Sequence, residues 1–297
     1  MTRAHQHTSH PAEGDHHPEH GHGGHRKHDD AGQAVILDLD AEVLAEHIAS
    51  ITAWLPLESE PRRIVDLGCG TGAGTFALLD RFPGAHVTAV DTSAGHLRLL
   101  REKAHARGVE GRVRTVRADL DARHWPDLGT PDLVWASASM HHMARPDRAL
   151  TNVHELLAPG GLFAVVELSG FPRFLPADAP ESRPGLEERA HAATESFHAE
   201  HVPHRGADWG PMLTVAGFTV AGERTVTVDI EGKHSEAVGR YAHGSLMRIR
   251  DVAAPALSPE DLTALDELLD TDGPNSILRR DDLAVRTERT VWAAHRA

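Results

Sequence analysis

The chain has 297 residues, 40% of them hydrophobic, which is enough for one large α/β domain with additions or for two small domains. Its 30 Lys and Arg against 44 Asp and Glu give a formal net charge of −14, with no basic block that would mark a nucleic-acid surface. The single cysteine excludes an internal disulfide, and no signal peptide or apolar run of transmembrane length is visible, so we expect a cytoplasmic protein that binds neither nucleic acid nor membrane.

Residues 1–33 are predicted to be a disordered, His-rich tail, because the first 30 residues hold nine histidines and no large apolar residue after Met1. Two interpretations stay open for it. The tail is either a solvated segment that binds divalent metals only adventitiously, or a metal-binding element on which the function depends. We favour the solvated segment because no fixed ligand spacing repeats.

A helix is predicted next, since apolar residues recur at steps of three and four from Leu37 to Leu55 and Pro56 ends the run. It precedes the stretch IVDLGCGTG, Ile64 to Gly72, which predicts a buried strand followed by a glycine loop. Without side chains at alternate loop positions, a ligand can lie against the backbone. Asp66 stands just before the loop, where a carboxylate can meet a cationic group.

The glycines alone leave two cofactors open, because Gly68, Gly70 and Ala73 also satisfy the looser spacing of nicotinamide dinucleotide loops. The next segments narrow the choice. A short helix (residues 74–82) leads to a second predicted strand, His86 to Ser93, that ends in Asp91. An acidic residue about 20 positions after such a loop is the expected ligand of ribose hydroxyls.

With these features the chain resembles the class I S-adenosylmethionine-dependent methyltransferases, whose first motif is an acidic residue followed by xGxGxG. Two further segments match the family: VRTVRADLDA (residues 113–122), with an acidic adenine contact at Asp119, and LLAPGGLFAVVEL (residues 156–168), with its turn and fifth strand. The resemblance implies S-adenosylmethionine as cofactor and a doubly wound, seven-stranded, mostly parallel sheet of Rossmann-like type, with helical insertions. The implied cofactor-binding residues are Asp66, Gly68, Cys69, Gly70, Gly72, Asp91, Thr92, Asp119, Leu120, Ala136 and Ser137.

The methyltransferase domain is expected over residues 34–297, with its cofactor-binding core at 64–169. Alternating strands and helices with short connections predict a parallel sheet covered on both faces, with strands near residues 63–67, 86–91, 113–117, 132–136 and 162–167. Two segments, 171–208 and 232–286, are predicted lids or helical insertions around a substrate pocket. Within the second, Ser258 and Pro259 have the pattern of a helix start.

Methyl transfer requires mainly that acceptor and cofactor be aligned and water excluded. A base is needed only for a protonated nucleophile, and His141 and His142, which follow the fourth strand, are candidates for that role. Their alternative role is structural. Glu195, His198 and His201 share one helical face at metal-ligand spacing, but a solvated polar face explains them without a metal, and we assign no metal site.

The function expected from the sequence is methyl transfer to oxygen or nitrogen of a small molecule. A nicotinamide-dependent oxidoreductase and a metal-responsive protein built on a catalytically idle fold are the alternatives; the LAPGG turn and the position of Asp66 count against the oxidoreductase.

Overall fold

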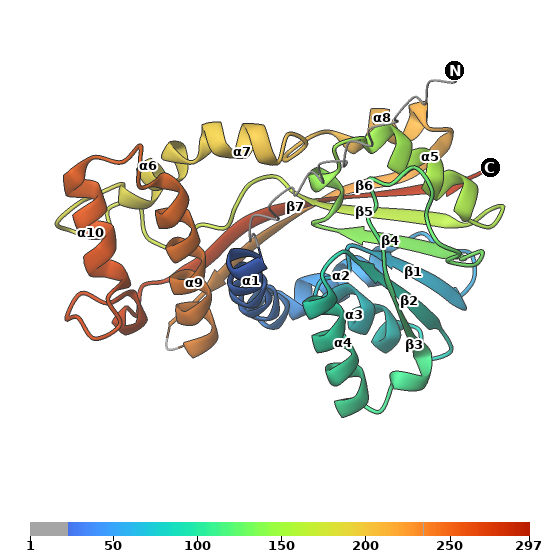
Figure 1. Cartoon of the computed structure of the whole chain (residues 1–297), viewed down its shortest axis with the longest axis horizontal. Helices are drawn as coiled ribbons and strands as arrows, with labels where there is room; N and C mark the ends of the chain where they lie inside the picture. The colour runs from blue at the N-terminus through green and yellow to red at the C-terminus, as the bar shows by residue number, and fades with distance from the viewer. Residues whose placement is uncertain (1–22, 234) are drawn as a thin grey trace, which may run out of the picture.

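The computed structural model describes residues 23–233 and 235–297 (Figure 1). Its strands form one seven-stranded sheet in the order β3-β2-β1-β4-β5-β7-β6. The first five strands in this order run parallel, β7 runs antiparallel to β5, and β6 antiparallel to β7. The strands are β1 (Arg63–Leu67), β2 (His86–Asp91), β3 (Val113–Arg117), β4 (Leu133–Ser137), β5 (Leu162–Leu168), β6 (Phe218–Glu231) and β7 (Ala284–Arg296).

The central strands are apolar almost throughout because helices cover both faces of the sheet. Ile64 and Trp135 pack on one face beneath α2, α3 and α4, whereas Val65 and Val134 pack on the other beneath α5 and α8. The described helices are α1 (Gly23–Val43), α2 (Ala45–Trp54), α3 (Ala73–Arg81), α4 (Ala94–Ala106), α5 (Pro146–Leu156), α6 (Leu186–Ala193), α7 (Glu195–His201), α8 (Trp209–Val215), α9 (Glu236–Ala253) and α10 (Pro259–Leu269), with short 3-10 turns η1 (Glu110–Arg112), η2 (Met140–His142) and η3 (Ile277–Arg279).

A second core lies outside the parallel sheet. The long strands β6 and β7 extend beyond β5, and their far ends pack against α6, α9 and α10, as Figure 1 shows. α1 lies between this helical part and the parallel sheet. Tyr241 of α9 and Phe174 form an edge-to-face ring pair in this core, with ring centroids 5.1 Å apart. The insertions are thus tied to the sheet by two strands and by α1.

The predicted doubly wound, mostly parallel sheet is confirmed, and the predicted strands match the observed ones closely. The helix start at Ser258 is also observed: its hydroxyl accepts from the backbone N–H of Asp261, and Pro259 opens α10.

Some boundaries differ. α1 begins at Gly23, inside the segment predicted to be tail, and the rest of that segment lies outside the described residues. The single helix predicted from Leu37 to Leu55 is two helices that break at Leu44, and the sequence shows no sign of the break because the apolar periodicity continues through it. β7 begins at Ala284, so the end of the 232–286 insertion belongs to the sheet.

Candidate active site

The glycine loop lies at the switch in strand order, between the carboxyl ends of β1 and β4. It opens onto a cleft of about 410 Å³. One side, which we call the loop wall, is formed by residues in the carboxyl-terminal parts of β1, β2 and β4 and in the segments that follow β1 to β4: Asp66, Gly68, Cys69, Gly70, Thr71, Ala73, Gly74, Asp91, Thr92, Ser93, His96, Asp119, Leu120, Asp121, Trp135, Ser137, Ala138, Ser139, His142 and Met143. The other side, the cover wall, comes from α1, α2 and β7: Gln33, Leu37, Asp40, Ile48 and Arg289.

Gly68 has to lack a side chain because the loop packs against the end of β4. A Cβ at Gly68 would lie 2.4 Å from the Cβ of Ser139, closer than two carbon atoms can approach. Ser139 also fastens this junction, since its hydroxyl donates to the carbonyl of Leu67 at 2.8 Å. Gly68 therefore allows the glycine loop to pack closely against the loop after β4, in addition to lining the cleft.

Asp91 holds the glycine loop against the end of β2. Its carboxylate accepts the backbone N–H of Gly70 at 2.9 Å and that of Ser93 at 2.8 Å. Burial alone would raise the pKa of Asp91, but the hydrogen bonds from His96, Ser93 and Gly70 outweigh burial and lower it below the ordinary value. Asp91 is thus anionic at neutral pH and fixed in place.

Asp66 is in a different state from Asp91. It is buried beneath the loop, where the Thr75 hydroxyl donates to it at 2.6 Å. Burial, augmented by the charge of Asp91, raises the pKa of Asp66 from 3.8 to about 7. Near neutral pH the Asp66 side chain is therefore partly protonated. A cation placed in the cleft would favour its charged form.

The two adjacent histidines have separate environments. His141 is buried, and its Nδ1 lies 2.5 Å from Oε2 of Glu167, so it does not line the cleft. His142 does line the cleft. His142 is an exposed residue, and partial desolvation together with the neighbouring His141 lowers its pKa from 6.5 to about 4, so its ring is neutral at pH 7.

Glu167, at the end of β5, holds the loop that carries these histidines. Its Oε1 accepts the backbone N–H groups of Ser139, Met140 and His141 at 3.2, 2.8 and 3.3 Å. The loop also contains Ala138, the one non-glycine residue in the described chain with a positive φ, 49°. No role in the site was predicted from the sequence for Glu167 or Ala138. The sequence did contain a signal for Glu167, because it is an acidic residue at the end of a predicted apolar strand.

Most predicted cofactor residues meet in the cleft. Asp66, Gly68, Cys69, Gly70, Asp91, Thr92, Asp119, Leu120 and Ser137 all line it, whereas Gly72 and Ala136 do not. Gly72 is the N-cap of α3, with φ 104°, and Ala136 is fully buried in β4. Burial also raises the pKa of the Cys69 thiol well above its ordinary value, which makes this cysteine a packed and unreactive side chain.

The predicted His-rich helical face has internal partners. Arg205 donates to Glu195 at 3.1 Å and lies 3.2 Å from Nδ1 of His198, while His201 stacks on Phe197. Across the described part of the chain, no three His, Cys, Asp or Glu side chains are grouped to hold a metal ion. Within residues 23–233 and 235–297, no helix has both the length and the apolar character needed to cross a membrane.

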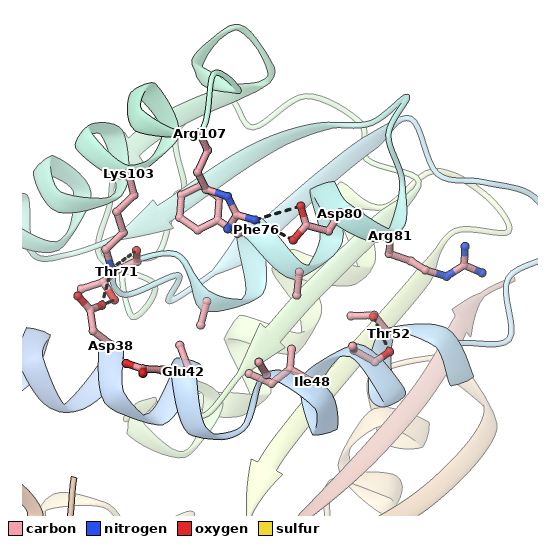
Figure 2. Close-up of a pocket in the computed structure, with 15 residues that line it drawn as sticks. Asp38, Glu42, Ile48, Thr52, Thr71, Phe76, Asp80, Arg81, Lys103 and Arg107 are labelled. Carbon is pink, nitrogen blue, oxygen red and sulfur yellow. Dashed lines mark hydrogen bonds and ion pairs between the residues drawn. The ribbon is translucent and has the colours of Figure 1, made fainter. Parts of the chain in front are cut away.

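A larger cavity, of about 660 Å³, lies between α1–α2 and the α3–α4 pair (Figure 2). Two of its charged pairs are internal. Lys103 donates to Asp38, and Arg107 donates to Asp80 at 2.8 Å while its guanidinium lies 4.7 Å from the centre of the Phe76 ring. Since the glycine loop contributes only Thr71 to this cavity, we assign the candidate site to the smaller cleft.

Comparisons with known proteins agree with this geometry. A family model described as a methyltransferase domain matches residues 64–161. The chain is 33% identical to a trans-aconitate 2-methyltransferase of Mycolicibacterium gilvum over 246 residues, which are 80% of this chain and 88% of the relative. It is 40% identical to a demethylmenaquinone methyltransferase of Thermus thermophilus over 119 residues, 40% of this chain.

That second match spans 53% of the relative, and a match to a trans-aconitate 2-methyltransferase of Paracidovorax citrulli spans 42% of that relative. Several curated relatives are therefore matched over only about half of their length. Among solved structures, a protein of Bacillus halodurans described provisionally as a methyltransferase has the same fold. The TM-score is 0.52 at 17% identity, covering 84% of this chain and 98% of that one.

Proposed function

Because the chain belongs to the methyltransferase family of these relatives, we propose that it transfers the methyl group of S-adenosylmethionine to oxygen or nitrogen of a small-molecule acceptor. The observation that carries this proposal is the convergence of Gly68, Gly70, Asp91 and Asp119 in one cleft at the switch point of the sheet. These residues come from the ends of β1, β2 and β3.

The residues of the loop wall fit this cofactor. Asp91, held by the backbone of Gly70, is suited to accept from ribose hydroxyls, and the exposed Asp119 beside the buried Leu120 is suited to the adenine ring. The cofactor is cationic at its sulfonium and ammonium groups, and the loop wall contains Asp66, Asp91, Asp119 and Asp121 with no Lys or Arg side chain among its described residues. The electrostatics thus favour a cation.

When bound, S-adenosylmethionine supplies an activated methyl group with a good leaving group, so the chain's own contribution is alignment and exclusion of water. Glu167 supports alignment by fixing the loop that carries His142 and Met143 into the cleft. With its pKa lowered to about 4, His142 is a weak base at pH 7. The proposed mechanism therefore relies on positioning, and His142 contacts the acceptor rather than removing its proton.

The acceptor of the Mycolicibacterium relative is, by that protein's name, trans-aconitate, a tricarboxylate. In the cleft of this chain, the aspartates at 40, 66, 91, 119 and 121 face a single cation, Arg289, among the described lining residues. Three carboxylates would meet more repulsion than attraction there. We therefore expect an acceptor with fewer negative charges than trans-aconitate.

The experiment is a conversion assay. The full chain is incubated with S-adenosylmethionine carrying a labelled methyl group and with panels of small alcohols, amines and carboxylic acids, and S-adenosylhomocysteine and labelled product are measured together. Gly70→Arg, which would place a long side chain at the cleft, is the matched inactive control. Acceptor-dependent formation of both products that the control lacks would support the proposal; equal rates for both chains would overturn it.

A further inference from the structure

Arg289 is a buried cation on the cover wall, and it belongs to none of the sequence motifs. It projects from β7 and is only 5% exposed. One terminal nitrogen donates to both carboxylate oxygens of Asp40, at 2.7 Å each, and the hydroxyl of Tyr241 donates to the same carboxylate at 2.6 Å. Residues from α1, α9 and β7 therefore hold this guanidinium in one position.

The pairing leaves part of the guanidinium unused. Among the described residues, the Nε–H of Arg289 is buried and has no hydrogen-bond partner. A guanidinium stays charged at any physiological pH and carries five N–H donors, and a buried donor without a partner destabilises the folded state. The unpaired Nε–H of Arg289, a residue that lines the cleft, is therefore suited to donate a hydrogen bond to an oxygen atom of a bound ligand.

The surroundings favour an anionic oxygen on a largely apolar body. Arg289 is the one Arg or Lys side chain among the described residues that line the cleft. Leu37 and Ile48 on the cover wall, with Met143 on the loop wall, supply apolar surface in the same cleft. These residues are also not needed for the ribose and adenine contacts assigned to Asp91 and Asp119.

We propose that Arg289 anchors a carboxylate of the methyl acceptor through its free Nε–H, and that the acceptor is a small monocarboxylic acid with an apolar body. This inference rests on the proposed function and names its substrate class. The Asp40 carboxylate keeps the guanidinium oriented, and its negative charge disfavours a second anionic group beside the first. Arg289 is thus a specificity residue that selects the acceptor.

The choice of a carboxylate over a phosphate follows from charge. Asp40 already neutralises the single positive charge of Arg289, so a phosphate dianion would add two uncompensated negative charges beside the pair. A carboxylate adds a single charge, and the cationic cofactor in the same cleft can balance it.

The test compares carboxylic acids with their uncharged amides of the same shape. Propionate, benzoate, 3-phenylpropionate and octanoate, and their amides, are titrated calorimetrically into the full chain, both free and saturated with S-adenosylhomocysteine. We expect at least one acid to bind the saturated protein about 10-fold or more tightly than its amide, as a charge-assisted hydrogen bond implies.

Variants locate the origin of that preference. Arg289→Gln alone would leave the half-buried Asp40 carboxylate without its cation, so the double variant Asp40→Asn with Arg289→Gln removes both charges. Arg289→Lys keeps the cation without the fork of donors. The matched control is Arg98→Gln, an exposed arginine on α4 paired with Glu102. The acid preference should persist in the control, weaken in Arg289→Lys and vanish in the double variant, while affinity for S-adenosylhomocysteine stays within about 3-fold in all.

Two results would overturn the inference: no acid preferred over its amide by the wild-type chain, or the same preference in the double variant. Failure of the proposed function is distinguishable from failure of this inference. In that case the wild-type chain would not bind S-adenosylhomocysteine, independently of its affinity for the carboxylic acids.

Discussion

The loop wall and the cover wall of the cleft are assembled in different ways. The loop wall comes from residues 66–143, in the carboxyl-terminal parts of the parallel strands and the segments that follow them. The cover wall joins Asp40 and Arg289, which are 249 positions apart, and Tyr241 of the helical part supports them. The loop wall is built from motifs that are local in the sequence, whereas the cover wall is built from residues that only tertiary packing brings together.

This difference separates two kinds of specificity. Because the loop wall depends on backbone geometry that many sequences with the same glycine spacing can reproduce, it is suited to a cofactor shared by a whole family. The cover wall depends on helices and a strand outside the motifs, so it is suited to the acceptor, which differs between family members. The predictions below perturb the loop wall to different degrees, and each should leave the Asp40–Arg289 pair intact.

The largest effect is expected from Gly70→Arg. At Gly70 a Cβ would meet only the Leu37 side chain, at 3.1 Å, so the change is directed into the cleft rather than the core. The wild-type melting temperature should rise with S-adenosylhomocysteine, because a ligand that binds only the folded state stabilises it. The variant should fold and show no such rise; an unchanged rise would mean that the loop wall is not the cofactor site.

The next largest effect concerns the pH dependence of stability. With its folded pKa raised from 3.8 to about 7, Asp66 disfavours the folded state once it ionises. Its contribution to stability is therefore fully present below about pH 4 and is lost as the pH rises through about 7, a change on the order of 4 kcal/mol.

Urea unfolding of the wild type and of Asp66→Asn at pH 5 and pH 8 measures this contribution. In Asp66→Asn the free energy of unfolding should fall less between pH 5 and pH 8 than it does in the wild type. The variant's gain in unfolding free energy over the wild type should therefore be larger at pH 8 than at pH 5. Parallel pH profiles for the two proteins would show that Asp66 is not destabilised by burial.

A smaller effect is expected from Gly68→Ala. The added Cβ would be forced against Ser139, and overpacking of this kind costs about 1–3 kcal/mol. Gly108→Ala is the matched control, since Gly108 has a similar positive φ of 65° and a Cβ there meets nothing within 4 Å. Chemical denaturation should show a larger loss of unfolding free energy for Gly68→Ala than for Gly108→Ala, which carries only the backbone strain. Equal stabilities would mean that the two loops are not packed as described.

The smallest effect is expected from His142→Asn. Because the pKa of His142 is lowered to about 4, the ring stays neutral across the neutral pH range and adds little as a base. We expect kcat to fall by less than about 10-fold, with no new limb in the pH–rate profile between pH 6 and pH 8. A base-catalysed mechanism predicts instead a loss of about 100- to 10,000-fold.

The sequence predicts the loop wall well for a physical reason. Buried parallel strands are nearly uninterrupted apolar runs, so their ends are easily located, and Asp66, Asp91 and Asp119 stand at those ends. The separation of His141 from His142 was not predictable, since it depends on Glu167 reaching the loop after β4. The helix break at Leu44 was also missed, because the apolar periodicity continues through it.

The cover wall was beyond prediction from sequence alone. Arg289 stands in β7, outside every sequence motif, and nothing near it in the chain indicates Asp40 or Tyr241 as partners. Side chains so distant in sequence are brought together by tertiary packing, which local patterns do not encode.

The central claim is that the glycine loop forms a site for S-adenosylmethionine, and calorimetric titration of the full wild-type chain with S-adenosylhomocysteine tests it most directly. We predict saturable binding with one site per chain, and no heat of binding with NAD or NADH under the same conditions. Absent binding of S-adenosylhomocysteine, or saturable binding of the nicotinamide dinucleotides in its place, would contradict the account.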